Sequence, residues 1–358
     1  MKLSPFEEAM AQLLPAGDLR DALASRGLPH RRVEEWKWSD LRTVLARFDG
    51  ATAPLVAEGS RQADFEPKPG SDLVMAQLAA ALGGPAQGFT LEDGETLRLD
   101  LAASPGAAHQ VFEIVVPEGA TATVRETYAA SEGAFANIAV VLKIGRGGTL
   151  HRVIEQDRAA GGVLVVTSEI DLAEEAALYQ TTLGFGAKLC RLETHVNHAG
   201  RGAGLRLDGA YLVGEGLHLD QTTLVRHLGP DGTTEELFKG AAKSGTGVFQ
   251  GKIFVDQTAQ KTDAQMQHRG LLLDDRAEID AKPELEIYAD DVVCAHGNAF
   301  GAINEDALFY MRQRGLSETK ARALLTESFL AEPLDRIADE TLRETLTARL
   351  RARLQEIA

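Results

Sequence analysis

The sequence has few cysteines, no long apolar run and no excess of positive charge. Its two cysteines, Cys190 and Cys294, lie too far apart for the CxxC pairs of zinc or redox motifs. So few cysteines do not indicate a secreted disulfide scaffold. No apolar run approaches the roughly 20 residues that span a bilayer. The N-terminus lacks the basic and apolar regions of a signal peptide, so we expect a cytoplasmic protein without a membrane partner.

Positive charge is scarce, with 37 Lys and Arg against 53 Asp and Glu, which gives a formal net charge of −16 at pH 7. A chain this acidic repels nucleic acid and anionic lipid, so we expect no nucleic-acid partner. The glycine-rich segment SGTGVFQGK (244–252) misses the phosphate-loop spacing GxxxxGK followed by Ser or Thr. We therefore expect no ATP-binding loop of that type in this chain.

The chain divides into four regions by texture. Residues 1–48 carry apolar side chains at helical spacing and predict an N-terminal helical region. Residues 49–107 are rich in Ala, Gly and Pro and predict a mixed linker region with short elements. Residues 108–300 alternate short runs of Val, Leu, Ile and Thr with Gly, Asp or Asn, which is typical of strands and turns. Residues 301–358 return to helical spacing.

So many short strands with almost no helix between them leave two architectures. One is a β-sandwich or barrel, and the other is a parallel β-solenoid in which each coil stacks on the last. A run of about 190 residues is long for a single sandwich of about 100. This length favours a mainly β protein with a β-solenoid core and helical regions at both ends. No strict repeat consensus decides between the two architectures, so the sandwich or barrel stays open at this point.

The C-terminal region carries clear helix boundaries. Asn304 and Ser317 are suited to cap two helices, Gly315 to end the first, and Pro333 to end the second. A last helix has leucines at i, i+4 spacing that either pack against the preceding helices or bind a partner, and packing is the favoured interpretation. These leucines are Leu342, Leu346, Leu350 and Leu354.

The segment YADDVVCAHG (288–297) combines a thiol with an imidazole. If the alternation of the preceding strand continues, Cys294 and His296 face outward, although a turn at 290–291 could reset its phase. Thiolate and imidazole suit iron, copper or zinc, yet stable zinc and iron–sulfur sites use about four ligands. Spacing alone favours a surface cysteine beside a solvated histidine. The alternative is a site completed by other ligands.

Other polar residues give weaker signals. Asp256, Lys261 and Asp263 could form the carboxylate and base cluster of a solenoid carbohydrate-active enzyme. Further histidines are interpreted as an outward polar ladder on a sheet rather than as metal ligands. They are His195, His198, His218, His227 and His268.

Residues 247–318 contain the segments AQKTDA, AEIDAKPELEIYADDV, CAHG and ALFYMRQRG, and RRVEEWKWSDL lies near the N-terminus. Together these segments resemble the SufB/SufD family of iron–sulfur cluster assembly proteins. The C-x-H-G arrangement at Cys294 and His296 is more similar to the SufD branch than to SufB. Ala295 replaces a serine common in relatives, and QMQHRG, which contains His268, is an atypical version of its stretch.

The resemblance implies a right-handed parallel β-helix that acts as a non-enzymatic scaffold. It implies a complex with a SufB-like paralogue and a SufC-like ABC ATPase that hydrolyses ATP. A transient iron–sulfur cluster or iron would be held at the SufB–SufD interface, with His296 as the main ligand and Cys294 as an auxiliary thiolate. The isolated chain would bind no cofactor stably. Exposed strand edges near the end of the solenoid, and not the resemblance, suggest that the isolated chain could form a homodimer.

The resemblance also implies that the C-terminal helices dock on the ATPase. The expected partner-binding residues are Leu308, Phe309, Tyr310, Arg312, Arg314, Leu324 and Phe329. Two other hypotheses stay open at this point: a β-solenoid carbohydrate-active enzyme, and a structural adaptor without metal chemistry.

Overall fold

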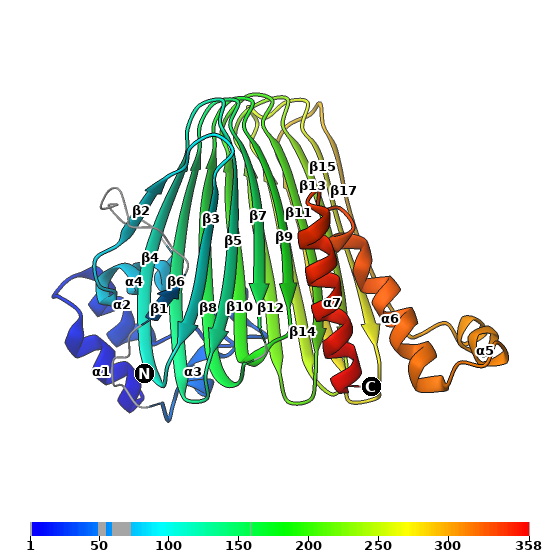
Figure 1. Cartoon of the computed structure of the whole chain (residues 1–358). Coiled ribbons are helices and arrows are strands. Elements are labelled where there is room, and N and C mark those ends of the chain that lie inside the picture. The colour runs from blue at the N-terminus through cyan, green and yellow to red at the C-terminus, as the bar shows by residue number, and fades with distance from the viewer. Residues whose placement is uncertain (1, 49–54, 59–72, 158, 358) are drawn as a thin grey trace.

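The centre of the molecule is a flattened β-solenoid made of two sheets (Figure 1). The computed structural model describes residues 2–48, 55–58, 73–157 and 159–357. One sheet has nine strands, all odd-numbered, and the other has eight, all even-numbered, each in sequence order. Each coil therefore contributes one strand to each sheet, and the predicted mainly β solenoid with helices at both ends is confirmed.

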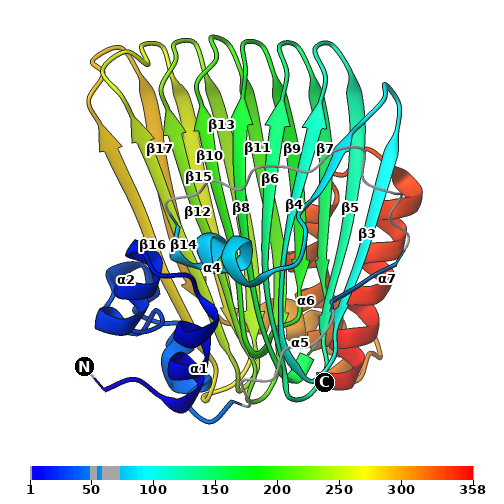
Figure 2. The same ribbon diagram turned by 90° about the vertical axis from the view of Figure 1, so that its left-hand side faces the viewer.

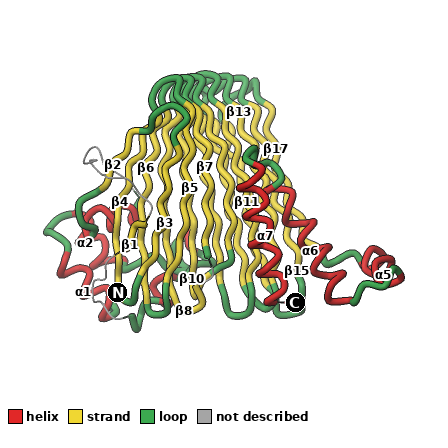
Figure 3. The backbone as a smooth tube through the Cα atoms, in the orientation of Figure 1, coloured by secondary structure: helices red, strands yellow, loops and turns green. Residues whose placement is uncertain are grey.

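The odd sheet consists of β1 (Leu55–Glu58), β3 (Thr96–Ala103), β5 (Thr121–Ala130), β7 (Thr149–Gln156), β9 (Ala177–Gly184), β11 (Gly204–Val213), β13 (Thr233–Ala242), β15 (Asp263–Leu272) and β17 (Val293–Gly301). The even sheet consists of β2 (Gln87–Thr90), β4 (Gly106–Val116), β6 (Ala134–Ile144), β8 (Ala159–Leu172), β10 (Ala187–His198), β12 (His218–His227), β14 (Thr246–Val255) and β16 (Glu278–Ile287). The turns that join them gather in rows at the two ends of the strands (Figure 3).

Neighbouring strands are parallel and closely in register, with β1 against β3 as the antiparallel pair among the described strands. Equivalent positions on successive coils therefore stack, as Arg191 does opposite Asp220, 29 residues later. Alternate side chains of both sheets, mainly Leu, Ala, Val and Ile, fill the interior as one continuous core. Each fully buried Leu, Val or Ile side chain contributes about 1.5–3 kcal/mol.

Glycine is required where an interior ring lies against the neighbouring strand. Tyr211 on β11 is opposite Gly240 on β13, and a Cβ at Gly240 would lie 1.7 Å from the ring carbon Cζ of Tyr211. Any larger residue at Gly240 would displace the ring, so this position specifies how the two coils pack.

The N-terminal helices cover the outer face of the even sheet (Figure 2). They are α1 (Pro5–Leu13), α2 (Asp18–Arg26), the 3₁₀ turn η1 (Glu34–Trp36), α3 (Leu41–Val44) and α4 (Val74–Leu82). Ser4 and Glu7 form a capping box that starts α1. Phe6 then packs edge-on against Phe135 of β6, with ring centroids 5.8 Å apart.

Three helices follow the solenoid: α5 (Glu305–Gln313), α6 (Glu318–Leu334) and α7 (Glu340–Ile357). The side chains of Asn304 and Ser317 accept hydrogen bonds from the first turns of α5 and α6, so both predicted caps are confirmed. Gly315 has φ +89°, as its predicted role at the end of α5 requires. The predicted end of α6 at Pro333 is wrong by one residue, because Leu334 completes the last turn.

The four leucines of α7 are buried with apolar residues on the outer face of the odd sheet, so the packing interpretation of that row is confirmed. Helix α5 projects away from the solenoid (Figure 1). None of the helices in the described part of the chain combines the length and apolar character that crossing a bilayer requires.

Candidate metal-binding site at the open end of the solenoid

The last coil leaves the solenoid open at its C-terminal end. Strands β16 and β17 are the final strands of their sheets, so each is hydrogen-bonded to a sheet neighbour on one edge. Most side chains of β17 are exposed, including those that would be core in an inner coil. Large apolar side chains are exposed there too, among them Tyr288, Val293 and Phe300. At this end, side chains that occupy core positions are therefore exposed at the surface.

Cys294 and His296 face the interior side of this last coil. Cys294 lies opposite Ala264 and His296 opposite Met266, both of which are fully buried core residues on β15. Cys294 itself packs against the core and is partly buried. The expectation that the side chains of Cys294 and His296 point outward is therefore wrong. His296 is exposed because no further described coil covers it.

The turn at 290–291 explains the reversal. Ala289 before it and Val292 after it both pack against the core, although they are three residues apart. Strict alternation would place such a pair on opposite faces. The turn is held to the previous coil by a hydrogen bond from the Lys261 N–H to the Asp291 carbonyl, at 2.6 Å. It shifts the phase of the alternation and turns Cys294 and His296 inward.

The two side chains form an incomplete donor set. Burial raises the pKa of the Cys294 thiol, and the charge of Asp263 raises it further, so metal binding would have to displace its proton. Within the described residues, no group of three or more His, Cys, Asp or Glu could hold a metal ion. Iron and zinc sites use about four ligands, so Cys294 and His296 would need donors from outside this chain.

A buried histidine lies next to this site on the inner side. A pocket of about 300 Å³ along β15 and β17 is lined by His268, His296 and Asn298, among others. His268 is fully buried and stacks on Phe249, with ring centroids 4.9 Å apart and an interplanar angle of 4°. Its ring contacts the Tyr211 hydroxyl at 2.8 Å and the Asn298 Oδ1 atom at 2.9 Å. Burial lowers the pKa of His268 to about 4, so the ring is neutral.

The predicted outward histidine ladder is wrong for three of its members. His198, His227 and His268 are fully buried and lie on interior faces, where each continues the alternation of the core residues before it. The rings of His198 and His227 are 4.5 Å apart on paired strands. Burial lowers their pKa values to about 4 and about 3. His195 and His218 do face outward, where their rings are in hydrogen-bond contact with Glu193 and Ser39, each at 3.0 Å.

An ion pair inside the solenoid was missed by the sequence analysis. Arg152 and Glu126 are both fully buried, and two guanidinium N–H groups donate to the two carboxylate oxygens at 2.8 Å each. Arg152 also donates to Gln180 and Ser168, at 2.9 Å each. The sequence offered one indication of this pair. An arginine and a glutamate, 26 residues apart, occupy positions where the alternation predicts core residues.

The segment RRVEEWKWSDL is positioned by a second buried cluster on the outer face of the even sheet. Arg191 donates to Asp220 at 2.6 Å, and Trp36 lies over the Arg191 guanidinium at 4.2 Å. The Ser39 hydroxyl donates to Asp220 at 2.5 Å and contacts His218 at 3.0 Å. These contacts attach the N-terminal region to β10 and β12, in the middle of the even sheet.

Comparison with known families decides the assignment. Residues 100–329, more than half of the chain, match the family model described as "SUF system FeS cluster assembly, SufBD core domain". The chain belongs to the SufB/SufD family of iron–sulfur cluster assembly proteins. The matched region contains both Cys294 and His296 as well as most of the solenoid.

Individual members of the SufB/SufD family support the same assignment. The iron-sulfur cluster assembly protein SufD of Escherichia coli is 30% identical over 250 residues, which cover 69% of this chain and 59% of that protein. An iron-sulfur cluster assembly SufBD family protein of Mycobacterium tuberculosis is 28% identical over 363 residues, with 92% and 90% covered. A SufBD family protein of Synechocystis is 31% identical over 247 residues, with 65% and 54% covered.

Of the apolar and aromatic side chains predicted to bind a partner on the C-terminal helices, some are exposed and others are buried. Phe309 and Tyr310 on α5 are 63% and 58% exposed, and Leu324 on α6 is 39% exposed. Leu308, predicted as a partner contact, is instead buried in the helical core. Phe329 is partly buried in that core, beneath the Lys239 ammonium at 4.6 Å.

The basic residues predicted as partner contacts are exposed. Arg314 donates to the Tyr310 hydroxyl at 3.0 Å, and Arg312 pairs with Glu318 at 3.4 Å. Both contacts lie at the surface, where water screens them. The exposed aromatic pair and these two guanidinium groups together form the surface named here the α5 patch, made of Phe309, Tyr310, Arg312 and Arg314.

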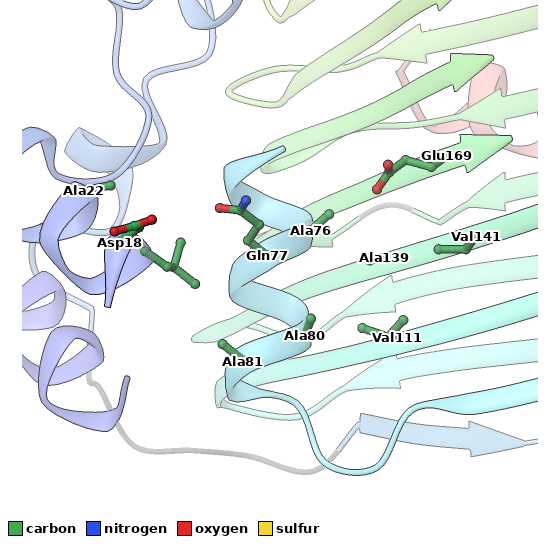
Figure 4. A pocket seen from close by; sticks show the side chains of 11 residues that line it. Asp18, Ala22, Ala76, Gln77, Ala80, Ala81, Val111, Ala139, Val141 and Glu169 are labelled. Atoms are coloured by element: carbon green, nitrogen blue, oxygen red, sulfur yellow. The ribbon is translucent and has the colours of Figure 1, made fainter. Parts of the chain in front are cut away.

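A separate pocket of about 610 Å³ lies between the N-terminal helices and the outer face of the even sheet (Figure 4). Its lining is mostly alanine and valine, with Asp18, Gln77 and Glu169 as the polar side chains. No thiol, imidazole or basic group is among the residues that line it. Its two carboxylates are fewer ligands than an iron or cluster site uses, and no group of three or more candidate ligands occurs among the described residues.

Proposed function

We propose that this chain is a non-enzymatic scaffold subunit of a complex with a SufB-like paralogue and a SufC-like ABC ATPase, working in the cytoplasm. His296 and Cys294 would hold one side of a transient iron–sulfur cluster, or an iron ion, at the interface with the SufB-like subunit. The cluster is cargo, and the isolated chain would retain none stably.

The observation that carries this proposal is the placement of the two donors on the open last coil. Both face the interior of the coil, and His296 is exposed there because no further described coil stacks on this end. Ligands on a partner that covers this end would meet them directly. Fewer than four ligands from one chain also suit a site that must release its cargo.

The strand edges at the same end provide a means of assembly. Strands β16 and β17 each present one edge beyond their sheet neighbour, and unpaired edges are templates for strand addition. The exposed side chains of Ile287, Tyr288, Val293 and Phe300 would supply apolar contact area. A paralogue with the same solenoid fold could continue both sheets. A second copy of this chain could do so in isolation, which is the basis for the proposed homodimer.

We propose that the α5 patch binds the ATPase. Exposed aromatic and arginine side chains are enriched at the centres of protein interfaces. Helix α6 connects this patch to the outer face of the odd sheet, against β11 and β13. Movements of the ATPase during ATP hydrolysis could therefore be transmitted to the solenoid and expose the ligands at its end.

The test is co-expression of the three chains followed by anaerobic purification and measurement of iron and acid-labile sulfide. The proposal predicts a stable complex that carries iron and sulfide, and little of either on this chain alone. A complex without iron or sulfide under cluster-forming conditions would support a structural adaptor instead. Failure to form any complex, with cleavage of a polysaccharide, would support the carbohydrate-active alternative.

A further inference from the structure

A basic pocket lies far along the odd sheet from Cys294 and His296, in a chain whose net charge is −16. It has a volume of about 400 Å³ and lies between the outer face of strands β3 to β11 and the start of α7. Its functional side chains are Arg98, Arg125, His151, Tyr179 and Arg206. Small-ligand sites have volumes of about 300–1,000 Å³, so its size fits one small molecule.

Coil stacking brings these residues together. Arg98 on β3 lies directly opposite Arg125 on β5. A second row on the same face is formed by His151, Tyr179 and Arg206, which lie opposite one another on β7, β9 and β11. Adjacent strands are about 4.8 Å apart, so the two arginines of the first row are spaced to contact one tetrahedral anion together.

Arg98 and Arg125 are available for such an anion. Neither forms a salt bridge or side-chain hydrogen bond with another residue in the described part of the chain. The charge of Arg125 acts on Glu155, but that carboxylate is already paired with Arg349. Asp339 is the acidic residue among those lining the pocket; it accepts the Leu342 N–H at the start of α7, where the positive end of the helix dipole offsets part of its charge.

The second row shapes the pocket wall. His151 stacks on Tyr179 with ring centroids 5.2 Å apart, and the Arg206 guanidinium lies over the same ring at 4.9 Å. The faces of Tyr179 are thus occupied, which leaves no aromatic platform for a stacked base or flavin. Burial, with the charge of Arg206, lowers the pKa of His151, so its neutral ring can donate one hydrogen bond.

The other residues that line the pocket suit a ligand in which an anionic group is attached to a carbon skeleton. Thr96, Thr123 and Thr181 supply hydroxyl groups, and Val153, Ile337 and Leu342 supply an apolar wall. A lone phosphate would leave that wall uncovered. The strongly acidic chain disfavours an extended polyanion such as nucleic acid.

We propose that this pocket binds a small phosphate monoester, with Arg98 and Arg125 holding the phosphate group. The site is independent of the cluster site at the last coil. It is also independent of the proposed complex, because all of its residues come from this chain.

The test is calorimetric titration of the full chain with ribose 5-phosphate, glycerol 3-phosphate, adenosine monophosphate and inorganic phosphate, with ribose as the uncharged comparison. The double variant Arg98→Gln/Arg125→Gln is compared with Arg31→Gln/Arg32→Gln, which removes the same charge from an exposed N-terminal pair. Thermal unfolding establishes that both variants are folded.

We expect at least one of the three esters to bind more tightly than inorganic phosphate, and ribose not to bind. Loss of a charge-assisted hydrogen bond should weaken ester binding about tenfold or more in the Arg98/Arg125 variant, with no change in the control. Equal affinity for inorganic phosphate and for every ester would overturn the proposal of a phosphate monoester and would identify phosphate itself as the ligand. No binding of any phosphate, or equal binding by both variants, would overturn the site.

Discussion

The Nδ1 atom of His268 lies 2.9 Å from the Oδ1 atom of Asn298, and this contact ties the buried core to the last strand. An amide oxygen only accepts hydrogen bonds, so the neutral ring donates from Nδ1 and accepts from the Tyr211 hydroxyl at Nε2. Asn298 shares a face of β17 with His296, two residues away. The contact therefore helps to hold the proposed ligand in place.

Replacing Asn298 should loosen β17. Asn298→Ala leaves the Nδ1–H of the buried His268 ring without its partner, which should lower the free energy of unfolding by about 1–3 kcal/mol. Hydrogen exchange across residues 293–301 should become faster. The control Gln267→Ala truncates an exposed side chain on the neighbouring strand and should leave both measurements unchanged. Equal protection of β17 in the two variants would contradict this role of His268.

The buried ion pair between Arg152 and Glu126 predicts a large effect of a single substitution. Arg152→Met leaves the Glu126 carboxylate buried without its counter-charge, which should cost about 3–5 kcal/mol in chemical denaturation at pH 7. Adding Glu126→Gln removes the isolated charge and should recover most of that loss. A double variant no more stable than Arg152→Met would show that the cost lies in packing rather than charge.

Glu236 should make stability depend on pH. It is fully buried with one hydrogen bond, from Thr223 at 2.8 Å, and burial raises its pKa to about 8. Burial favours the neutral carboxyl in the folded protein. The stabilisation of the folded state that results is fully present below the pKa of the unfolded chain, near 4.5, and is lost as pH rises through 8.

The variant Glu236→Gln cannot ionise and should therefore gain stability over the natural chain between pH 4.5 and 8. The difference should grow by up to about 1.4 kcal/mol per pH unit. Thermal unfolding across this range measures it, with Glu174→Gln at an exposed turn as the control. A constant difference across the range would show that Glu236 stays ionised in the fold.

The α5 patch should affect partner binding without affecting the fold. Phe309→Ser/Tyr310→Ser removes two exposed rings, so the free energy of unfolding should change by no more than about 0.5 kcal/mol. Affinity for the SufC-like ATPase should fall about tenfold or more if the rings are central to that interface. Leu13→Ser, at another exposed apolar position, is the control. Unchanged affinity in the double variant would place the ATPase contact elsewhere.

Local signals in the sequence were sufficient for some features and not for others. The helix caps at Asn304 and Ser317 depend on a few neighbouring residues, and the sequence alone located both. The orientation of His296 depends on how many residues the turn at 290–291 adds to the alternation. Residue types at a turn do not determine that number, because contacts with the previous coil select the turn's conformation.

Contacts between coils were not predictable, because no repeat consensus marks which positions stack. Arg98 and Arg125, or Glu126 and Arg152, become neighbours only once the register of each coil is known. Composition and the length of the β region favoured the solenoid and the family resemblance supported it, whereas the polar groups inside the solenoid required the register. The family resemblance drew attention to Cys294 and His296, and the register then showed which way they point.

The central claim is that His296 is a ligand for a cluster shared with the SufB-like subunit. The most direct measurement is the iron and sulfide content of the anaerobically purified three-chain complex containing His296→Ala. The matched control is Glu174→Ala, which truncates an exposed side chain at the turn between β8 and β9, away from the last coil. We predict an intact complex that loses most of its iron and sulfide with His296→Ala and keeps both with Glu174→Ala. Full iron and sulfide content in the intact His296→Ala complex would contradict the claim.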